Sequence, residues 1–404
     1  MLNLFVLIFF FGATFSLLAW LYILFQPARA WDFQPVGDDG DVPARPTGAA
    51  FPSVAIIVPA RNEGETLPRT LPALLHQDYP GAYQIYLVDD RSTDRTADIA
   101  RDIVRRENSE ARSSLLQGAP LPEGWMGKVW ALDQGAKAAS ESGVEYFLLT
   151  DADILHSPCS LRRLVSESMA ASLGLNSRMA RLRCESPAER LLIPAFVWFF
   201  NILYPMRRAN NPDDSLASAA GGCMLLSRDA WIQLGESLEC IKSKIIDDIN
   251  LARQVKGRGL PIRLSLSRTE VLSSREYPHL SDIWKMVRRT AFTELQYSWL
   301  RLAGALAGLA LMFIVPLGAV ITGLTAFLIG PAPILAAVLA IKGLIALAIM
   351  GHVYAPAMRF FKLPVLFAFS LPFAGVLYGL MTLDSAVRHA RGKGVQWREP
   401  AAAK

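Results

Sequence analysis

An uncharged, predominantly apolar run from residue 2 to residue 25 restricts the fold of this chain more than any other segment. A helix rises 1.5 Å per residue, so about 20 apolar residues cross the hydrocarbon core of a bilayer. No basic residue precedes the run, and Arg29 follows it. We therefore expect a membrane anchor whose positive flank, with the chain beyond it, lies on the cytoplasmic side. Residues 27–30 also resemble a signal-peptide cleavage site, which is the competing interpretation.

The apolar pattern returns after residue 281. Three further runs, at residues 302–330, 331–350 and 363–383, are each long enough to cross a bilayer. A hydrophobic fraction of 52% and a mean hydropathy of +0.28 agree with a chain that lies partly in lipid. The number of C-terminal spans stays open at two or three. Two observations count against three spans. Inserting Lys342 into the bilayer would cost about 2.5–3.5 kcal/mol of free energy if the side chain were central and unpaired. Three spans would also put the basic tail outside, against the positive-inside tendency.

The charged residues do not indicate a nucleic-acid-binding protein. The net charge is +5, but the basic residues are dispersed and form no Lys/Arg-rich run with interleaved aromatic residues. We interpret the positive excess as attraction to a membrane surface. The cysteines form no Cys-x-x-Cys pair and have no nearby histidines at metal-ligand spacing. Ordinary reduced thiols are therefore expected at Cys159, Cys184, Cys223 and Cys240.

Between the apolar ends, short apolar runs alternate with helix-like segments. Strands are expected at residues 54–58, 85–88 and 146–149, and helices at residues 65–77 and 92–106. Ser92 and Thr93 are expected to cap the second helix. The alternation predicts an α/β fold with an open, mostly parallel sheet and crossover helices. Such sheets bind ligands at the carboxyl edge of their strands.

These patterns divide the chain into six expected segments. The boundaries follow changes in composition, with Pro, Gly and Asp marking the linker. The segments are an N-terminal anchor (1–26), a linker (27–52), a cytoplasmic α/β domain (53–281), an amphipathic interfacial segment (282–301), C-terminal membrane helices (302–383) and a basic tail (384–404).

Polar residues follow each expected strand. The first strand runs into residues 59–63, a proline-fixed turn whose charged groups can hydrogen-bond a base or a ribose. An ordinary strand-to-helix loop would also explain this turn. The second strand runs into Asp89 and Asp90. Two adjacent carboxylates repel each other, so they need a partner that a helix cap does not supply.

The third strand runs into Asp151-Ala152-Asp153. In an extended segment residues i and i+2 point to one face, so the two carboxylates could hold one divalent cation. Mg²⁺ or Mn²⁺ prefers hard oxygen ligands and bridges to a substrate diphosphate, where it offsets charge on the leaving nucleotide. A single Asp-x-Asp occurs by chance in many proteins. Three acidic strand ends in this order are more specific.

The ordered motifs resemble those of the family 2 inverting glycosyltransferases, whose nucleotide-sugar domain has the GT-A fold. The motifs are residues 59–63, residues 89–94, Asp151-x-Asp153 and the later Asp247-Asp248-x-x-Leu251. A narrower resemblance, to the hopene-associated glycosyltransferases of bacterial hopanoid gene clusters, rests on three further segments. They are residues 124–131 (Gly-Trp-x-Gly-Lys-x-Trp-Ala), Gln134-Gly135 and residues 219–225 (Ala-Ala-Gly-Gly-Cys-Met-Leu). The similarity extends over nearly the whole chain.

The resemblance implies a role for each matched residue. It implies that Asp151 and Asp153 position the donor and its Mg²⁺ or Mn²⁺. It implies that Lys128 faces the diphosphate, although a solvated surface lysine also fits the sequence. Asp248 would be the general base and Asp247 its neighbour, with helix capping as the competing explanation. Contacts to the nucleoside are implied for Pro59, Ala60, Glu63, Asp89 and Asp90.

The acceptor side carries weaker signals. Gly221 and Gly222 resemble a small-residue turn that permits close backbone approach, although tight packing would also explain them. Arg288 and Arg289 precede the expected membrane helices. Basic residues at such a position either pair with a diphosphate or determine on which side of the membrane the flanking segment lies. The Gln-x-x-Arg-Trp motif of processive relatives is absent from this region, which indicates a single transfer. Trp397-Arg398 resembles the end of the Trp-x-x-Arg tail of lipid glycosyltransferases.

These features predict an inverting, metal-dependent glycosyltransferase that passes several times through the inner (cytoplasmic) membrane. It would move one sugar from a nucleotide-diphosphate sugar to a lipid acceptor, with a hopanoid or another isoprenoid-derived alcohol as the expected acceptor. Two alternatives remain, namely transfer to polyprenyl phosphate and a membrane protein that binds a nucleotide sugar without turnover. Asp247 and Asp248 favour catalysis, because a binding protein does not need them. The sequence does not determine the sugar, the nucleotide or the oligomeric state.

Overall fold

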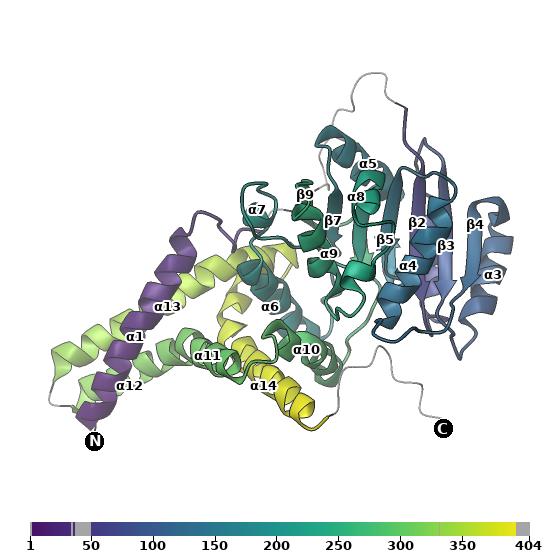
Figure 1. Cartoon of the computed structure of the whole chain (residues 1–404). Helices are drawn as coiled ribbons and strands as arrows, with labels where there is room; N and C mark the ends of the chain where they lie inside the picture. The colour runs from purple at the N-terminus through teal and green to yellow at the C-terminus, as the bar shows by residue number, and fades with distance from the viewer. Residues whose placement is uncertain (1, 34, 37–49, 331, 393–404) are drawn as a thin grey trace. The chain divides into compact units, whose positions relative to one another are not determined.

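The computed structural model describes residues 2–33, 35–36, 50–330 and 332–392 (Figure 1). The chain divides into two compact units. The sheet unit consists of the described residues within 34–183 and 206–276, and the helical unit of those within 1–33, 184–205 and 277–395. Trp397-Arg398 lies outside the described residues.

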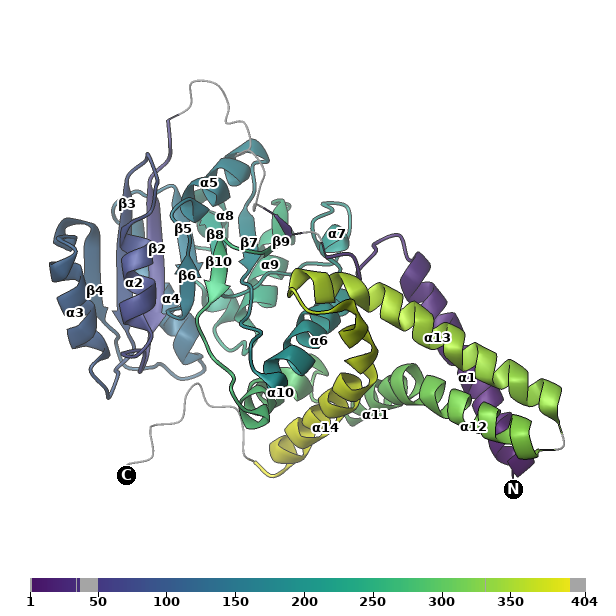
Figure 2. The same ribbon diagram turned by 180° about the vertical axis from the view of Figure 1, so that it is seen from behind.

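Within the described residues, the sheet unit contains one large sheet of eight strands in the order β1-β9-β7-β8-β5-β2-β3-β4 (Figures 1 and 2). Only β8 runs antiparallel to its neighbours, β5 and β7. A separate antiparallel pair is formed by β6 and β10. The mostly parallel sheet predicted from the sequence is therefore confirmed. The bounds are β1 (Pro35–Val36), β2 (Val54–Ala60), β3 (Tyr83–Asp89), β4 (Ser113–Gln117), β5 (Tyr146–Thr150), β6 (Ile154–His156), β7 (Leu175–Met179), β8 (Cys223–Ser227), β9 (Ile262–Ser267) and β10 (Val271–Ser273).

Helices cover both faces of the large sheet. All seven residues of β2 are buried, and alternate residues of a strand point to opposite faces. Ile56 packs in a core with α2, α3 and α5, whereas Ile57 packs in a second core with α4, α8 and α9. A strand that is covered on both faces needs apolar residues along most of its length. The sequence of β2 shows such a continuous apolar run. The helices are α2 (Leu67–Leu75), α3 (Thr96–Arg106), α4 (Gly127–Ser140), α5 (Ser160–Ala170), α7 (Met206–Ala209), α8 (Arg228–Gln233) and α9 (Asp247–Lys256).

The predicted capping of α3 by Ser92 and Thr93 is wrong. The helix begins at Thr96, whose backbone N–H donates to the Asp94 carboxylate at 2.9 Å. Ser92 instead accepts a hydrogen bond from the backbone N–H of Asn62, and the Thr93 N–H donates to the Asn62 side chain. The two residues join the loops after β2 and β3, because a strand end leaves polar groups that need partners before the helix starts.

The helical unit contains four helical segments long and apolar enough to cross a membrane, within the part of the chain that the structure describes. They are Leu7–Phe25, Trp299–Ile329, Pro333–Phe360 and Val365–Ala390. Three of these four segments come after the sheet unit in the sequence. The sequence left the number of C-terminal spans open at two or three, and the number of candidate segments is three. The elements are α1 (Leu2–Phe25), α6 (Pro187–Leu203), α10 (Leu280–Glu294), α11 (Trp299–Leu309), a π-helical turn (Ala310–Ile314), α12 (Val315–Ile329), α13 (Pro333–Phe360), a 3₁₀ turn (Val365–Ser370) and α14 (Leu371–Ala390).

Helix α6 groups with the helical unit, although it lies between β7 and β8 in sequence. Its Trp198 is buried, and the indole N–H donates to the carbonyl of Val353 in α13 at 3.2 Å. Residues 184–205, which lie within the range 53–281 that the sequence assigns to the α/β domain, thus group with the helical unit. An apolar helix is stabilised by packing against other apolar helices, whatever its place in the sequence.

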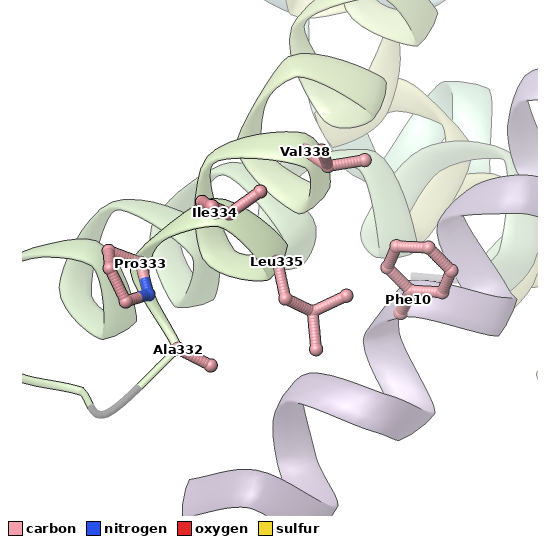
Figure 3. A pocket seen from close by; sticks show the side chains of 6 residues that line it. All are labelled: Phe10, Ala332, Pro333, Ile334, Leu335 and Val338. Carbon is pink, nitrogen blue, oxygen red and sulfur yellow. The ribbon is translucent and has the colours of Figure 1, made fainter.

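Lys342 has partners within the helical unit that offset its expected cost. Its ammonium donates to the Thr14 hydroxyl of α1 at 2.8 Å and lies 3.5 Å from the centre of the Phe10 ring. A pocket of about 530 Å³ opens beside this contact, between α1 and α13 (Figure 3). Its lining is apolar and consists of Phe10, Ala332, Pro333, Ile334, Leu335 and Val338.

Gly135 generates a testable prediction about the sheet unit. A Cβ atom at this position of α4 would lie 2.5 Å from a methyl carbon of Ile57 and 3.0 Å from one of Val88. Gly135→Ala is expected to destabilise the protein by about 1–3 kcal/mol through overpacking, which exceeds the about 1 kcal/mol gained in helix propensity. Thermal unfolding of the full chain in detergent, followed by circular dichroism, measures the change. Ser140→Ala in the same helix should lower the midpoint much less, and equal midpoints for the two variants would contradict the packing argument.

Candidate active site

The carboxyl ends of β2 and β3 bring together the residues that the family resemblance assigns to the nucleoside. The strands are parallel neighbours, and Ala60 lies opposite Asp89. The backbone N–H of Asp90 donates to the Ala60 carbonyl at 2.8 Å, so Pro59 and the two aspartates share one edge of the sheet. Glu63 lies in the following turn, where its N–H donates to Thr96 at 2.8 Å.

Asp90, which follows Asp89 in the sequence, has a positively charged partner that offsets the repulsion between the two carboxylates. Its side chain is buried, and Oδ2 accepts a hydrogen bond from Arg61 at 3.2 Å. The guanidinium of Arg91 lies 3.8 Å from Oδ1, which accepts no hydrogen bond from the residues that the structure describes. Sequence reasoning placed Arg61 in the turn but gave it no role of its own. The site therefore holds a buried carboxylate oxygen that can still accept a hydrogen bond.

Asp151 and Asp153 do not lie in an extended segment, so the argument that placed them on one face is wrong. Strand β5 ends at Thr150, and the Ile154 N–H donates to the Asp151 carbonyl at 3.1 Å, which closes a turn. The two carboxylates have different partners. Asp151 pairs with Lys128 at 2.8 Å, and Asp153 pairs with Arg275 at 2.8 Å.

Arg275 is a site residue that the sequence did not reveal. It follows β10, whose antiparallel pairing with β6 brings it to the Asp151–Asp153 turn. Its Nε donates to Asp153 at 2.8 Å, and its Nη2 lies 3.7 Å from Glu63. Because 122 positions separate Arg275 from Asp153, no local pattern marks this contact. Arg275 links the nucleoside side of the site to the Asp-x-Asp turn.

Lys128 is the central cation of the other half of the site. It lies in the first turn of α4, and its ammonium contacts Asp151 at 2.8 Å and Asp247 at 3.1 Å. Burial by itself would lower the pKa of Lys128, but the neighbouring carboxylates of Asp151 and Asp247 raise it above its ordinary value. The alternative of a solvated surface lysine is wrong, because only 19% of this side chain is exposed.

Asp247 and Asp248 begin α9, as the sequence predicted. Asp248 accepts hydrogen bonds from the backbone N–H of Gly221 and of Ile249, each at 2.8 Å. The N-cap residue Ile246 supplies no capping side chain. The close approach of Gly221 needs a glycine, since a Cβ there would lie 3.1 Å from the Lys128 ammonium and 3.3 Å from Asp248.

The cluster has the electrostatics of a proton-transfer site. Burial, followed by the nearby Asp247 carboxylate, raises the pKa of Asp248 to about 7. Burial also raises the pKa of Asp151, while Lys128 opposes the rise. A carboxylate that titrates near neutral pH can accept a proton efficiently under cellular conditions.

Buried polar contacts support the turn that carries Gly221 and Gly222. Thr150 donates to the Gly222 carbonyl at 2.8 Å and contacts the ring of His156 at 2.9 Å. Burial lowers the pKa of His156 to about 4, so this ring is neutral at pH 7. On the next strand, Ser177 accepts from the Ala220 N–H at 2.8 Å.

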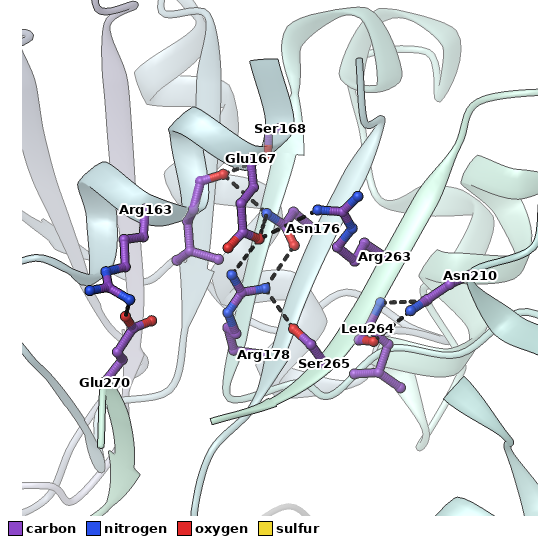
Figure 4. Close-up of polar contacts among 11 residues, drawn as sticks. Arg163, Glu167, Ser168, Asn176, Arg178, Asn210, Arg263, Leu264, Ser265 and Glu270 are labelled. Carbon is purple, nitrogen blue, oxygen red and sulfur yellow. Dashed lines mark hydrogen bonds and ion pairs between the residues drawn. The ribbon is translucent and has the colours of Figure 1, made fainter. Parts of the chain in front are cut away.

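A second buried polar cluster surrounds Arg178 of β7 (Figure 4). Arg178 is fully buried, pairs with Glu167 of α5 and donates to Ser265 of β9 at 2.7 Å. A buried guanidinium needs such a set of acceptors, and once satisfied it restricts neighbouring strands to one arrangement. We interpret this cluster as a support that ties β7 to α5 and β9.

The two arginines expected on the acceptor side lie in the helical unit. Arg288 of α10 contacts Asp384 of α14 at 3.4 Å, and Asp384 also accepts from the Trp284 indole at 2.8 Å. Arg289 is exposed. Arg288 is thus engaged in holding α10 against α14.

Residues 55–235 match the family model described as Glycosyl transferase family 2. A protein from Mesorhizobium japonicum named N-acetylglucosaminyltransferase is 27% identical over 197 residues, which is 48% of this chain and 44% of that one. A 4,4'-diaponeurosporenoate glycosyltransferase from Staphylococcus haemolyticus is 32% identical over 107 residues, or 26% of each chain. The matches thus span less than half the length of these relatives.

A solved mannosyltransferase from Pyrobaculum calidifontis, in complex with GDP-Man and Mn²⁺, has a TM-score of 0.53 and 18% identity. The similarity covers 97% of this chain and 100% of that one. Residues 55–235 are therefore similar to a family 2 glycosyltransferase domain, and the chain has a GT-A-like α/β fold.

The carboxylates at the Asp151–Asp153 turn fit a divalent cation that also binds phosphate oxygens. Among the described residues, no three His, Cys, Asp or Glu side chains gather into a complete metal site. Mg²⁺ and Mn²⁺ commonly take one or two protein carboxylates and complete their shell with water and substrate phosphates. The ammonium of Lys128 and the guanidinium of Arg275 neutralise these two carboxylates, so a divalent cation would take the place of positive charge that the turn already attracts.

Removing the central cation should destabilise the protein in a pH-dependent way. Lys128→Met leaves Asp151, Asp247 and Asp248 without their shared counter-charge, so the folded state will bind protons more tightly than the unfolded state. The loss of stability is expected to be about 2–4 kcal/mol at pH 8 and to shrink as the pH falls towards 5. Thermal unfolding in detergent at several pH values tests this. Lys242→Met removes an exposed pair and should change little, and a deficit that does not depend on pH would contradict the assignment.

Proposed function

We propose that this chain is a membrane-bound, inverting glycosyltransferase that moves a single sugar from a nucleotide-diphosphate sugar to a lipid acceptor. The observation that carries the proposal is the position of Asp248 beside Asp247 and Lys128, with its pKa raised to about 7. The family 2 domain and its GT-A-like fold support a nucleotide-sugar donor.

The donor's nucleoside would bind at the ends of β2 and β3, in contact with Pro59, Ala60, Glu63, Asp89 and Asp90. The buried Asp90 Oδ1 supports this assignment, because it accepts no hydrogen bond from the described residues and can receive a base or ribose donor. Lys128 would then meet the diphosphate, which lies between nucleoside and sugar. The sheet edge thus suits an extended, anionic ligand.

Asp151 and Asp153 would hold Mg²⁺ or Mn²⁺ with the donor. When bound, the cation neutralises charge that develops on the leaving nucleoside diphosphate. The solved mannosyltransferase with Mn²⁺ supports a metal in this fold. Metal dependence therefore belongs to the proposed function.

Inversion follows from a single displacement at the anomeric carbon. The acceptor hydroxyl attacks this carbon, its proton passes to an oxygen of Asp248, and the bond to the diphosphate oxygen breaks. A hydroxyl is a poor nucleophile at neutral pH, so a positioned carboxylate is required as the bond forms. Asp247, held by Lys128, would orient Asp248 and, by raising its pKa, make its carboxylate a stronger base.

The acceptor is proposed to be a lipid alcohol, specifically a hopanoid. The four candidate membrane spans support an acceptor that stays in the bilayer, and the narrower sequence resemblance supports a hopanoid. Gly221 and Gly222 would line its approach to Asp248. Transfer to polyprenyl phosphate is the alternative within the same donor site, and the lipid profile of cells lacking the gene distinguishes the two.

We place the sheet unit on the cytoplasmic side of the inner membrane. Arg29 follows the first span, and positive residues that flank a span favour the cytoplasm. Nucleotide sugars are made in that compartment, so the donor would be available there.

The base assignment predicts the effect of Asp248→Asn. Turnover should fall by about 10²- to 10⁴-fold, because general-base catalysis is lost, while donor binding and folding change little. In the wild type, the rate should rise about tenfold per pH unit up to about pH 7 and level off above it, since only the carboxylate accepts a proton. Sugar transfer to extracted lipids, measured against pH, tests both points.

Asp229→Asn is the matched control for Asp248→Asn. Asp229 is an exposed acid in the first turn of α8 and lies outside the site, so this variant should keep the wild-type rate and pH profile. A nearly unchanged rate for Asp248→Asn, or a product that retains the anomeric configuration, would rule out single displacement with this base.

Metal dependence gives a second functional prediction. Excess chelator should abolish transfer, and added Mn²⁺ or Mg²⁺ should restore it in the wild type but not in the Asp151→Asn/Asp153→Asn double variant. The matched control is the double variant Asp98→Asn/Asp102→Asn, which also removes two negative charges, but from the exposed face of α3. Its activity should respond to chelator and to added metal as that of the wild type does. Full activity in excess chelator would eliminate the metal from the proposal.

A further inference from the structure

Two side-chain cations occupy the carboxylates that the proposed function assigns to the metal. The Lys128 ammonium lies 2.8 Å from Asp151, and the Arg275 guanidinium lies 2.8 Å from Asp153. The cations come from different elements, namely the first turn of α4 and the segment after β10. A divalent cation binding between the same carboxylates would meet both of these charges at short range.

Each cation also has a second carboxylate within reach. Lys128 lies 3.1 Å from Asp247, and Arg275 lies 3.7 Å from Glu63. Either group can therefore leave its first partner without losing every ionic contact. An ion that moves between two partners loses far less free energy than one that is left unpaired in a partly buried site.

The backbone around Asp153 is fixed independently of the Arg275 guanidinium. The N–H and the hydroxyl of Ser274 both donate to the Asp153 carbonyl, each at 2.8 Å. Asp151 is similarly attached, since its N–H donates to the Gly222 carbonyl at 3.3 Å. The carboxylates can thus change partners while their main chain stays in place.

We propose, on the basis of the function proposed above, that Lys128 and Arg275 compete with the divalent metal for Asp151 and Asp153. In the donor-free protein they neutralise these carboxylates and hold metal affinity low. When donor and metal bind together, the two side chains shift towards Asp247, Glu63 and the anionic diphosphate. Arg275 is therefore a positioning residue that links metal binding to donor binding.

The consequence is synergy between the two ligands. A metal ion that binds without the donor is repelled by the two cationic side chains. When the donor binds as well, the negative charge of its diphosphate offsets this repulsion. By thermodynamic linkage, donor raises metal affinity by the same factor by which metal raises donor affinity, typically about 5- to 150-fold. The protein would thereby avoid holding a metal ion when no donor is present.

Binding of Mn²⁺ alone tests this inference without any turnover. The full-length chain in detergent is titrated with Mn²⁺, and free Mn²⁺ is followed by electron paramagnetic resonance. Arg275→Gln should tighten Mn²⁺ binding about fivefold or more, because a competing charge is gone. A residue that merely supports the site would give the opposite sign, since its loss would disorder Asp153 and weaken the metal. Lys128→Met should act in the same direction and provides a second, independent measurement.

Arg101→Gln is the control for net charge, because Arg101 pairs with Asp98 on the exposed face of α3. This variant should bind Mn²⁺ like the wild type. Unchanged or weaker Mn²⁺ binding in Arg275→Gln would overturn the inference, even if Mn²⁺-dependent sugar transfer is found. Conversely, tighter Mn²⁺ binding by Arg275→Gln in a protein without transferase activity would support the competition and refute the proposed function.

Discussion

The candidate site depends on one ammonium group placed among three carboxylates. Lys128 contacts Asp151 and Asp247 directly, and Asp248 lies close enough to contribute to its pKa. Without this charge, the carboxylates would repel one another at the end of a sheet that excludes much of the solvent. The ammonium therefore allows the loop after β5, the start of α4 and the start of α9 to meet.

The antiparallel strand β8 provides the geometry for that meeting. In a purely parallel sheet every strand would deliver its carboxyl end to the site. Because β8 runs the other way, its start lies beside the end of β5, with Thr150 opposite Cys223. This places Gly221 next to Asp248 and lets a backbone N–H hold the proposed base. One reversed strand thus brings a small-residue turn to an edge otherwise lined with acids.

The helical unit obeys different physics from the sheet unit. Its candidate spans are apolar around much of their circumference, and many of their large side chains are exposed in the isolated chain. Lipid would cover these surfaces in a membrane. Polar contacts also join helices of this unit, and one example is Asp384 of α14, which pairs with Trp284 and Arg288 of α10.

The sequence by itself determined the features that depend on neighbouring residues. Apolar runs predicted the four candidate membrane spans, alternating segments predicted β2, β3 and β5, and the acids after those strands marked the sheet edge. Only the tertiary structure decided which charges meet. Arg275 reaches Asp153 across 122 positions through the pairing of β10 with β6, and Asp151 turns instead of continuing its strand. The periodicity of apolar residues indicates which face of a helix or strand is buried. Ion pairs depend instead on strand order and side-chain direction. Both are set only when distant segments of the chain pack together.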